Sequence, residues 1–144
     1  MTQPDIARIA AETRSIAVVG LSPKPDRPSH EVAHYLQKLG YRIIPVNPGH
    51  AGERILGETT YATLSDIPAG TEVDMVDIFR RSESVPEVVD EALAALPGLK
   101  TIWMQMGVMH EGAAEKARAA GKTVVQNRCP KVEFPRVGAT GPAR

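Results

Sequence analysis

The chain has 144 residues, with 17 lysines and arginines against 17 aspartates and glutamates, and a single cysteine. This length is enough for one domain with a substantial core and too short for two ordinary ones. The zero net charge argues against a general binder of nucleic acid or membrane surfaces, which would carry a basic excess. One cysteine excludes an internal disulfide and favours a cytoplasmic location, and no apolar stretch is long enough to span a membrane.

Short apolar runs bounded by glycine, proline and asparagine alternate with segments of helical periodicity. In chain order we expect a helix at 4–13, a strand at 15–19, a helix from its N-cap Ser29 to Gly40, a strand at 41–46, an irregular segment at 49–72 with a helical turn at 64–67, a strand at 73–79, a helix capped by Ser82 or Ser84, a strand at 101–104, a helix at 110–120 and a strand at 123–125. The irregular segment is expected to lie over one edge of the sheet. Residues 138–144 are expected to form a disordered tail.

Alternation of strands and helices predicts an α/β fold: a doubly wound, five-stranded parallel sheet covered on both faces, in a single domain over residues 1–137. We expect the strand order 3-2-1-4-5, with the switch point between the first and fourth strands. Ligands of such sheets bind beyond the carboxyl ends of the strands at that point.

The loop that follows the first strand has features of a phosphate-binding turn. The strand breaks at Gly20, the loop carries Lys24 and Arg27, and a helix begins near Ser29. A buried strand, a glycine and a helix N-terminus are the usual components of an anion site in an open α/β sheet. Arg80, Arg81 and Arg128 also follow strands, so the expected topology brings five cations to one crevice and predicts a local anion site.

A nicotinamide dinucleotide is disfavoured as the ligand. The G-x-G-x-x-G turn is missing after Gly20, and the second strand ends in Asn47-Pro48 where an acidic residue would hold the ribose. The loop cations would suit an additional phosphate, such as that of NADP or the 3′-phosphate of coenzyme A.

Five motifs carry a family resemblance: IAVVGLSPKPDRPS at 16–29, GYRIIPVNP at 40–48, VDIFRR at 76–81, WMQMG at 103–107 and NRCPK at 127–131. In this order they resemble the small stand-alone CoA-binding domain proteins (the YccU-like group), a family similar to the CoA-binding domain of the succinyl-CoA synthetase α subunit. The resemblance covers about residues 14–137. It implies a Rossmann-like fold that binds coenzyme A or an acyl-CoA as a small-molecule ligand, with no established catalysis.

Carried over by position, the resemblance also implies site residues. The first loop, which would embrace the CoA phosphates, contributes Gly20, Leu21, Ser22, Lys24, Arg27 and Ser29. The resemblance places Asn47 and Pro48 near the adenosine, and Ile78, Phe79 and Arg80 on the adenine or pantetheine side. Gln105 and Gly107 match the fourth motif, and Asn127 and Cys129 match the last. The synthetase relatives have a glycine-rich first loop, whereas Pro23, Pro25 and Pro28 make this one stiffer.

No residue is assigned a catalytic or metal-binding role. Ser22 lacks the G-x-S-x-G elbow, and His30 with His34 lacks a third metal ligand. Cys129 is interpreted as a small buried residue, with pairing to the CoA thiol as the alternative. Phe79 and Trp103 are interpreted as core residues rather than platforms for stacking a base. Asp77 is expected to tie down a nearby loop by accepting backbone hydrogen bonds.

These observations favour a non-enzymatic module that binds CoA. Two alternatives stay open: an enzyme that uses NADP or another nucleotide, and a regulatory subunit of an acyl-CoA enzyme. In the second alternative the leading helix at 4–13 would dock a partner enzyme. The sequence does not decide between a monomer and a homo-oligomer.

Overall fold

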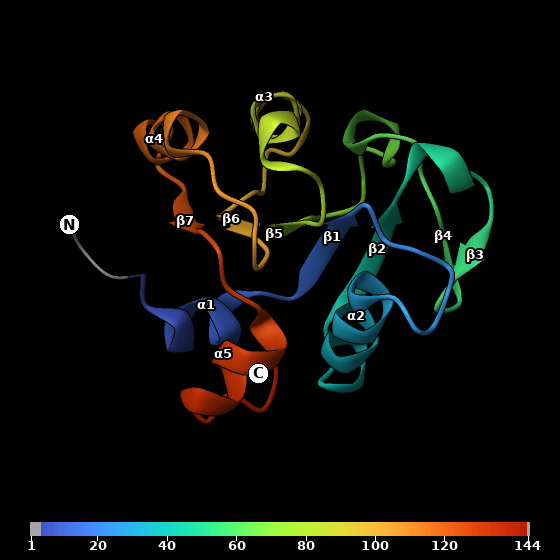
Figure 1. The fold of residues 1–144 in the computed structure, drawn as a ribbon, viewed down its shortest axis with the longest axis horizontal. Helices are drawn as coiled ribbons and strands as arrows, with labels where there is room; N and C mark the ends of the chain where they lie inside the picture. The colour runs from blue at the N-terminus through green and yellow to red at the C-terminus, as the bar shows by residue number, and fades with distance from the viewer. Residues whose placement is uncertain (1–3, 144) are drawn as a thin grey trace.

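The computed structural model describes residues 4–143. Its centre is a parallel sheet of five strands in the order β2-β1-β5-β6-β7 (Figure 1). The strands are β1 (Ser15–Val19), β2 (Arg42–Val46), β5 (Met75–Ile78), β6 (Thr101–Met104) and β7 (Thr123–Val125). They are nearly continuous apolar runs because helices cover both faces of the sheet. The expected α/β class, parallel sheet and five strands are confirmed, and the fold is Rossmann-like.

The expected strand order is wrong in one respect. The third strand of the sheet, β5, was expected outside β2 but pairs with β1, in register Val18 to Asp77. The place beside β2 is occupied by the irregular segment: the N–H of Tyr61 donates to the carbonyl of Pro45 at 3.0 Å, and the N–H of Asn47 donates to the carbonyl of Tyr61 at 2.8 Å. The chain therefore crosses over β1 one strand earlier than expected, and the switch point lies between β1 and β5.

Helices cover both faces of the sheet (Figure 1). α3 (Val85–Ala95) and α4 (Glu111–Ala119) share a face, and α1 (Ile6–Glu12), α2 (Pro28–Lys38) and α5 (Pro130–Arg136) lie on the opposite one. α5 was not expected from the sequence, because it has only seven residues and contains Pro135. Each face has its own apolar cluster, so the sheet is buried between two cores.

The start of α2 differs from the expectation. The helix begins at Pro28 with Arg27 as N-cap, and the side chain of Arg27 forms no capping hydrogen bond. Proline is suited to the first helical position because its φ is preset and it has no N–H to leave unpaired. Ser29 is therefore inside the first turn, where its Oγ accepts a hydrogen bond from the N–H of Ser22 at 3.0 Å. The predicted stop is confirmed: Gly40 follows the C-cap with a φ of +109°.

The irregular segment lies over the β2 edge, as expected. It contains a small antiparallel hairpin of β3 (Arg54–Ile55) and β4 (Glu58–Thr59), and a 3-10 turn at Leu64–Asp66. Further 3-10 turns lie at Pro48–His50 and Ser82–Ser84. None of the described helices is both long and apolar enough to cross a membrane.

The end of the chain passes close to α1. The N–H of Ala143 donates to the carbonyl of Ala11 at 2.8 Å, and Nη2 of Arg14 donates to the carbonyl of Ala143 at 2.7 Å. The domain limit at residue 137 and the disorder of the tail stay predictions, which limited proteolysis would test; Arg144 lies outside the described residues.

Candidate functional site

Backbone hydrogen bonds align the carboxyl ends of the central strands. The N–H of Gly20 donates to the carbonyl of Val46 at 2.8 Å, and the N–H of Phe79 donates to the carbonyl of Val19 at 2.8 Å. The residues that follow β1, β2 and β5 therefore lie at one rim, beside the switch point. Ligands of open α/β sheets bind at this place.

Gly20 is required at this rim by both its backbone and its surroundings. Its φ is +89°, a conformation that side chains with a Cβ rarely adopt. A Cβ at this position would lie 2.3 Å from the carbonyl oxygen of Phe79. The loops after β1 and β5 consequently approach each other more closely than any other residue would allow.

A first hollow of about 450 Å³ lies between the loop after β1 and the start of α2. The residues that line it are Gly20, Ser22, Lys24, Arg27, Pro28, Ser29, His50 and Phe79. Neither Lys24 nor Arg27 forms an ion pair with a described residue, and no carboxylate is among the lining residues. The first hollow therefore combines two unpaired cations with a helix N-terminus.

Local hydrogen bonds hold the loop around the first hollow. The Oγ of Ser29 accepts from the N–H of Ser22, and the Oγ of Ser22 accepts from the N–H of Lys24 at 3.1 Å. Each hydroxyl acts as an acceptor in these bonds, which leaves its own hydrogen to donate to a ligand. The dipole of α2 adds positive potential at the same place, although Pro28 has no N–H and the N–H of His30 already donates to the carbonyl of Arg27.

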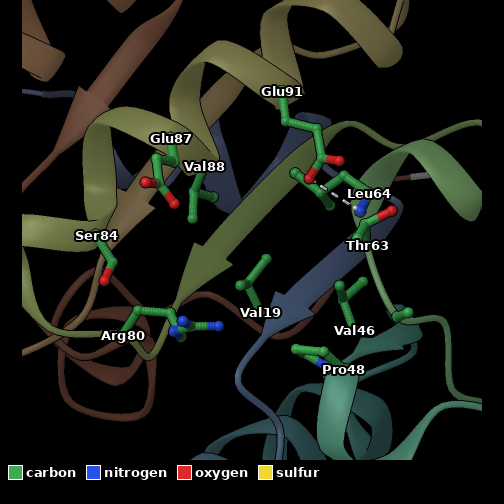
Figure 2. A pocket seen from close by; sticks show the side chains of 11 residues that line it. Val19, Val46, Pro48, Thr63, Leu64, Arg80, Ser84, Glu87, Val88 and Glu91 are labelled. Atoms are coloured by element: carbon green, nitrogen blue, oxygen red, sulfur yellow. Dashed lines mark hydrogen bonds between the residues drawn. The ribbon is translucent and has the colours of Figure 1, made fainter.

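A second hollow of about 310 Å³ lies on the α3 side of the same rim (Figure 2). Its apolar lining consists of Val19, Val46, Pro48, Ala62, Leu64 and Val88. Its polar lining consists of Thr63, Arg80, Ser84, Glu87 and Glu91. Figure 2 shows the Arg80 side chain extending from the end of β5 into this space.

The two hollows adjoin at the end of β1. Val19 lines the second hollow and Gly20 the first; in the same way Arg80 lines the second and Phe79 the first. The Cδ of Arg80 lies within 3.4 Å of the Cβ position built on Gly20. Arg80 therefore lies at the boundary between the two hollows.

The structure brings together only part of the expected site. Gly20, Ser22, Lys24, Arg27, Ser29 and Phe79 line the first hollow, and Pro48 and Arg80 line the second. Leu21 and Ile78 are core residues, and Gln105 and Cys129 are also buried. Asn47 links two loops: its Nδ2 donates to the carbonyl of Leu21 at 3.0 Å, and its Oδ1 accepts from the N–H of Gly49 at 3.0 Å. The Oδ1 of Asn127 accepts from the N–H of Gly107 at 2.7 Å, which joins the loops after β6 and β7.

Two of the five expected cations lie outside both hollows. Arg81 pairs with Glu83 at 3.4 Å, and Arg128 pairs with Glu133 at 3.6 Å. The cations that line the two hollows are Lys24, Arg27 and Arg80.

The expected role of Asp77 belongs to Asp74. The Oδ2 of Asp74 accepts from the N–H groups of Arg14 and Ser15 at 2.7 and 2.9 Å, which ties the chain before β1 to the chain before β5. Asp77 is fully buried, and neither of its carboxyl oxygens has a hydrogen-bond partner among the described residues. Burial raises its pKa well above the ordinary value.

The remaining predictions about single residues concern the core and metals. Trp103 is fully buried against Phe134, with ring centroids 5.9 Å apart, so its assignment to the core is confirmed. Phe79 is only partly buried: it packs against the same core cluster and also lines the first hollow. The burial of Cys129 agrees with its interpretation as a small buried residue. The described residues contain no group of three metal-ligating side chains.

Sequence reasoning missed the acidic wall of the second hollow. Glu87 and Glu91 are one turn apart on α3, and in the sequence they resemble the solvated face of an amphipathic helix. Only the packing of α3 beside the segment at 62–64 makes them lining residues.

Comparison with known proteins agrees with the resemblance in the sequence. Residues 14–135 match a protein family described as CoA binding domain. The uncharacterized protein YneT of Bacillus subtilis (strain 168) is 38% identical over 131 residues, which are 91% of this chain and 93% of YneT. A solved structure from Pyrococcus horikoshii OT3 is 36% identical with a TM-score of 0.84, covering 94% of this chain and 96% of that one.

A larger enzyme contains a similar domain. The dinucleotide-forming acetyl-coenzyme A synthetase 1 of Ca. Korarchaeum cryptofilum, solved in complex with phosphate and ADP, is 25% identical with a TM-score of 0.64. The match covers 83% of this chain and 26% of the synthetase chain. Because the family match spans most of the sequence, this chain belongs to the family of CoA-binding domain proteins.

Proposed function

We propose that this chain binds coenzyme A or an acyl-CoA at the carboxyl ends of β1 and β5 as a binding module, without catalysing a reaction on it. The observation that carries the proposal is the composition of the first hollow. Lys24, Arg27 and the uncapped start of α2 converge there, with no carboxylate among the lining residues. We place the phosphates of the ligand in this hollow.

The physical basis is charge-assisted hydrogen bonding to a polyanion. Hydrogen bonds from Lys and Arg to phosphate are shorter and stronger than neutral ones. The hydroxyls of Ser22 and Ser29 supply further donors, and the dipole of α2 favours an anion at its N-terminus. The close packing of Gly20 on the backbone of Phe79 leaves no side chain between the loop backbone and the anion.

Family membership favours CoA over the alternative of NADP or another nucleotide. The similar synthetase acts, by its name, with acetyl-coenzyme A, which supports the same ligand class for this chain. The alternative of a regulatory subunit requires that α1 binds a partner enzyme. Ile9 and Ala10 of α1 are buried in the domain, and the hydroxyl of Tyr41 donates to the carbonyl of Ala10, so α1 packs on its own fold.

Isothermal titration calorimetry with CoA tests the proposal. We expect wild type to bind, and Lys24→Ala and Arg27→Ala each to weaken binding about tenfold or more, because each removes a charged donor. Lys38→Ala is the matched control, since Lys38 is exposed at the opposite end of α2. Undetectable binding by wild type, or equal binding by wild type and both site variants, would refute the proposal.

A further inference from the structure

The two hollows of the site differ in the sign of their charge. The first is lined by Lys24 and Arg27 without a carboxylate, whereas the second contains Glu87 and Glu91 with only Arg80 to balance them. Phosphate groups are attracted to the first hollow and repelled by the acidic wall of the second. A ligand that spans both must therefore place its phosphates in the first hollow and an uncharged group in the second.

The lining of the second hollow suits a flat, largely apolar ring. Val19 and Pro48 come from the strand ends, and Val88 faces them from α3 (Figure 2). The guanidinium of Arg80 extends into the same space and has no ion-pair partner among residues 4–143. A planar guanidinium is well suited to stack on the face of an aromatic ring.

The two carboxylates of the second hollow, those of Glu91 and Glu87, differ in their hydrogen bonding. Glu91 accepts from the N–H of Leu64 at 3.2 Å and from the hydroxyl of Ser65 at 2.8 Å, and so holds the segment beyond β4 against α3. Glu87, one turn earlier, is exposed to solvent, forms no ion pair with another described residue, and directs its carboxylate toward the hollow (Figure 2). Glu87 thus offers an unused acceptor at the rim of an apolar space.

We infer that Glu87 is the specificity-determining residue of the second hollow: its carboxylate accepts a hydrogen bond from the exocyclic amino group of an adenine ring that is stacked on Arg80. The inference rests on the proposed function. It specifies that the adenine end of the ligand enters the second hollow and that its exocyclic amino group is what Glu87 recognises. A base with a carbonyl oxygen in place of the amino group would place that oxygen, an acceptor, against the carboxylate of Glu87, which is also an acceptor. Such a mismatch removes the charge-assisted hydrogen bond and places two acceptors side by side, which disfavours the carbonyl-bearing base.

The test compares two ligands that differ only in this group. Adenosine 3′,5′-bisphosphate and inosine 3′,5′-bisphosphate carry the same phosphates, and their affinities are measured by calorimetry for wild type, Glu87→Gln and Glu83→Gln. We expect wild type to prefer the adenosine compound about tenfold or more. Glu87→Gln should bind the two compounds within about twofold of each other, because its amide can donate as well as accept. Glu83→Gln, the control at an exposed site on the same side of the fold, should keep the wild-type preference.

The possible failures are distinguishable. If wild type binds both bisphosphates equally, or if Glu87→Gln keeps the wild-type preference, the role of Glu87 is refuted while the CoA proposal stands. If wild type binds neither bisphosphate nor CoA, the proposed function itself fails. Arg80→Ala provides a second readout: it should weaken both ligands by a similar factor and leave their ratio unchanged, since stacking does not depend on the exocyclic group. A changed ratio in Arg80→Ala would contradict the stacked arrangement.

Discussion

Replacing Asp77 by asparagine should stabilise the fold, and the gain should grow as the pH rises. Asp77 lies in the middle of the sheet, paired in register with Val18 on β1 and Trp103 on β6. It is fully buried and has no hydrogen-bond partner among the described residues. Burial without a compensating charge disfavours the ionised carboxylate and raises its pKa well above the ordinary value of 3.8.

The sign of the pH dependence follows from proton binding. Above pH 3.8 the unfolded chain releases the proton of Asp77, whereas the folded chain keeps it until the pH reaches the raised pKa. Between these two limits the folded state binds one proton more, so this residue lowers the free energy of unfolding by about 1.4 kcal/mol for each unit of rising pH. Above the folded-state pKa the loss stops growing. Asparagine is neutral in both states and similar in shape, so the variant avoids the whole loss.

Urea unfolding followed by far-UV circular dichroism, at several pH values from about 4 to 8, measures this effect. The difference in unfolding free energy between Asp77→Asn and wild type should be small near pH 4 and should then widen with the slope given above. Asp74→Asn is the matched control on the same segment. It should destabilise the chain, because the substitution disturbs the two backbone N–H bonds that Oδ2 of Asp74 accepts. A difference between Asp77→Asn and wild type that does not change with pH would refute the reasoning.

Three further predictions concern the rim and the core. An alanine in the left-handed conformation costs roughly 1 to 2 kcal/mol. Gly20→Ala should lower the free energy of unfolding by more than this, because its Cβ would also collide with the carbonyl of Phe79. Gly52→Ala, at a φ of +87° in open space, should lower it only by the cost of the left-handed conformation. Chemical denaturation of both variants checks this, and equal losses would argue against the close approach. Trp103→Phe should lower the free energy of unfolding by about 1 to 3 kcal/mol in the same assay, since the carbonyl of Arg128 loses the hydrogen bond that the indole N–H donates at 2.8 Å. An unchanged unfolding midpoint would contradict a stabilising role for that bond. The affinity for CoA should fall as salt rises from low to physiological ionic strength, and a salt-independent affinity would speak against phosphate binding at Lys24 and Arg27.

Much of the fold could be predicted because its signals are local. Each strand is a short apolar run, and the helices show regular apolar spacing with recognisable ends such as Gly40. The strand order could not be predicted, because it depends on the pairing of Tyr61 with the outer edge of β2. That pairing is a single bridge within an irregular segment and has no periodic signature. α5 was missed for a similar reason: a seven-residue helix with an internal proline has little pattern to detect.

The candidate site divides in the same way. Lys24 and Arg27 lie in the loop between Gly20 at the end of β1 and the start of α2. Their place at the carboxyl end of the sheet could therefore be predicted from the chain order. The acidic wall of the second hollow arises from α3 packing beside residues 62–64, two segments joined by no local pattern. For Arg81 and Arg128 the sequence predicted a site role that the structure does not give them. Both follow strands, but they pair with Glu83 and Glu133 and line neither hollow.

The Tyr61 bridge also bears on how copies of this chain can meet. An uncovered outer strand offers its free amides and carbonyls to another molecule, which is a common route to aggregation. At one margin of the sheet, Tyr61 covers the carboxyl end of β2 by pairing with the carbonyl of Pro45 and with the N–H of Asn47. At the other margin, β7 is only three residues long, which is too short to recruit a neighbour efficiently. Any self-association of this protein should therefore use its helical faces rather than a sheet continued from one molecule into the next.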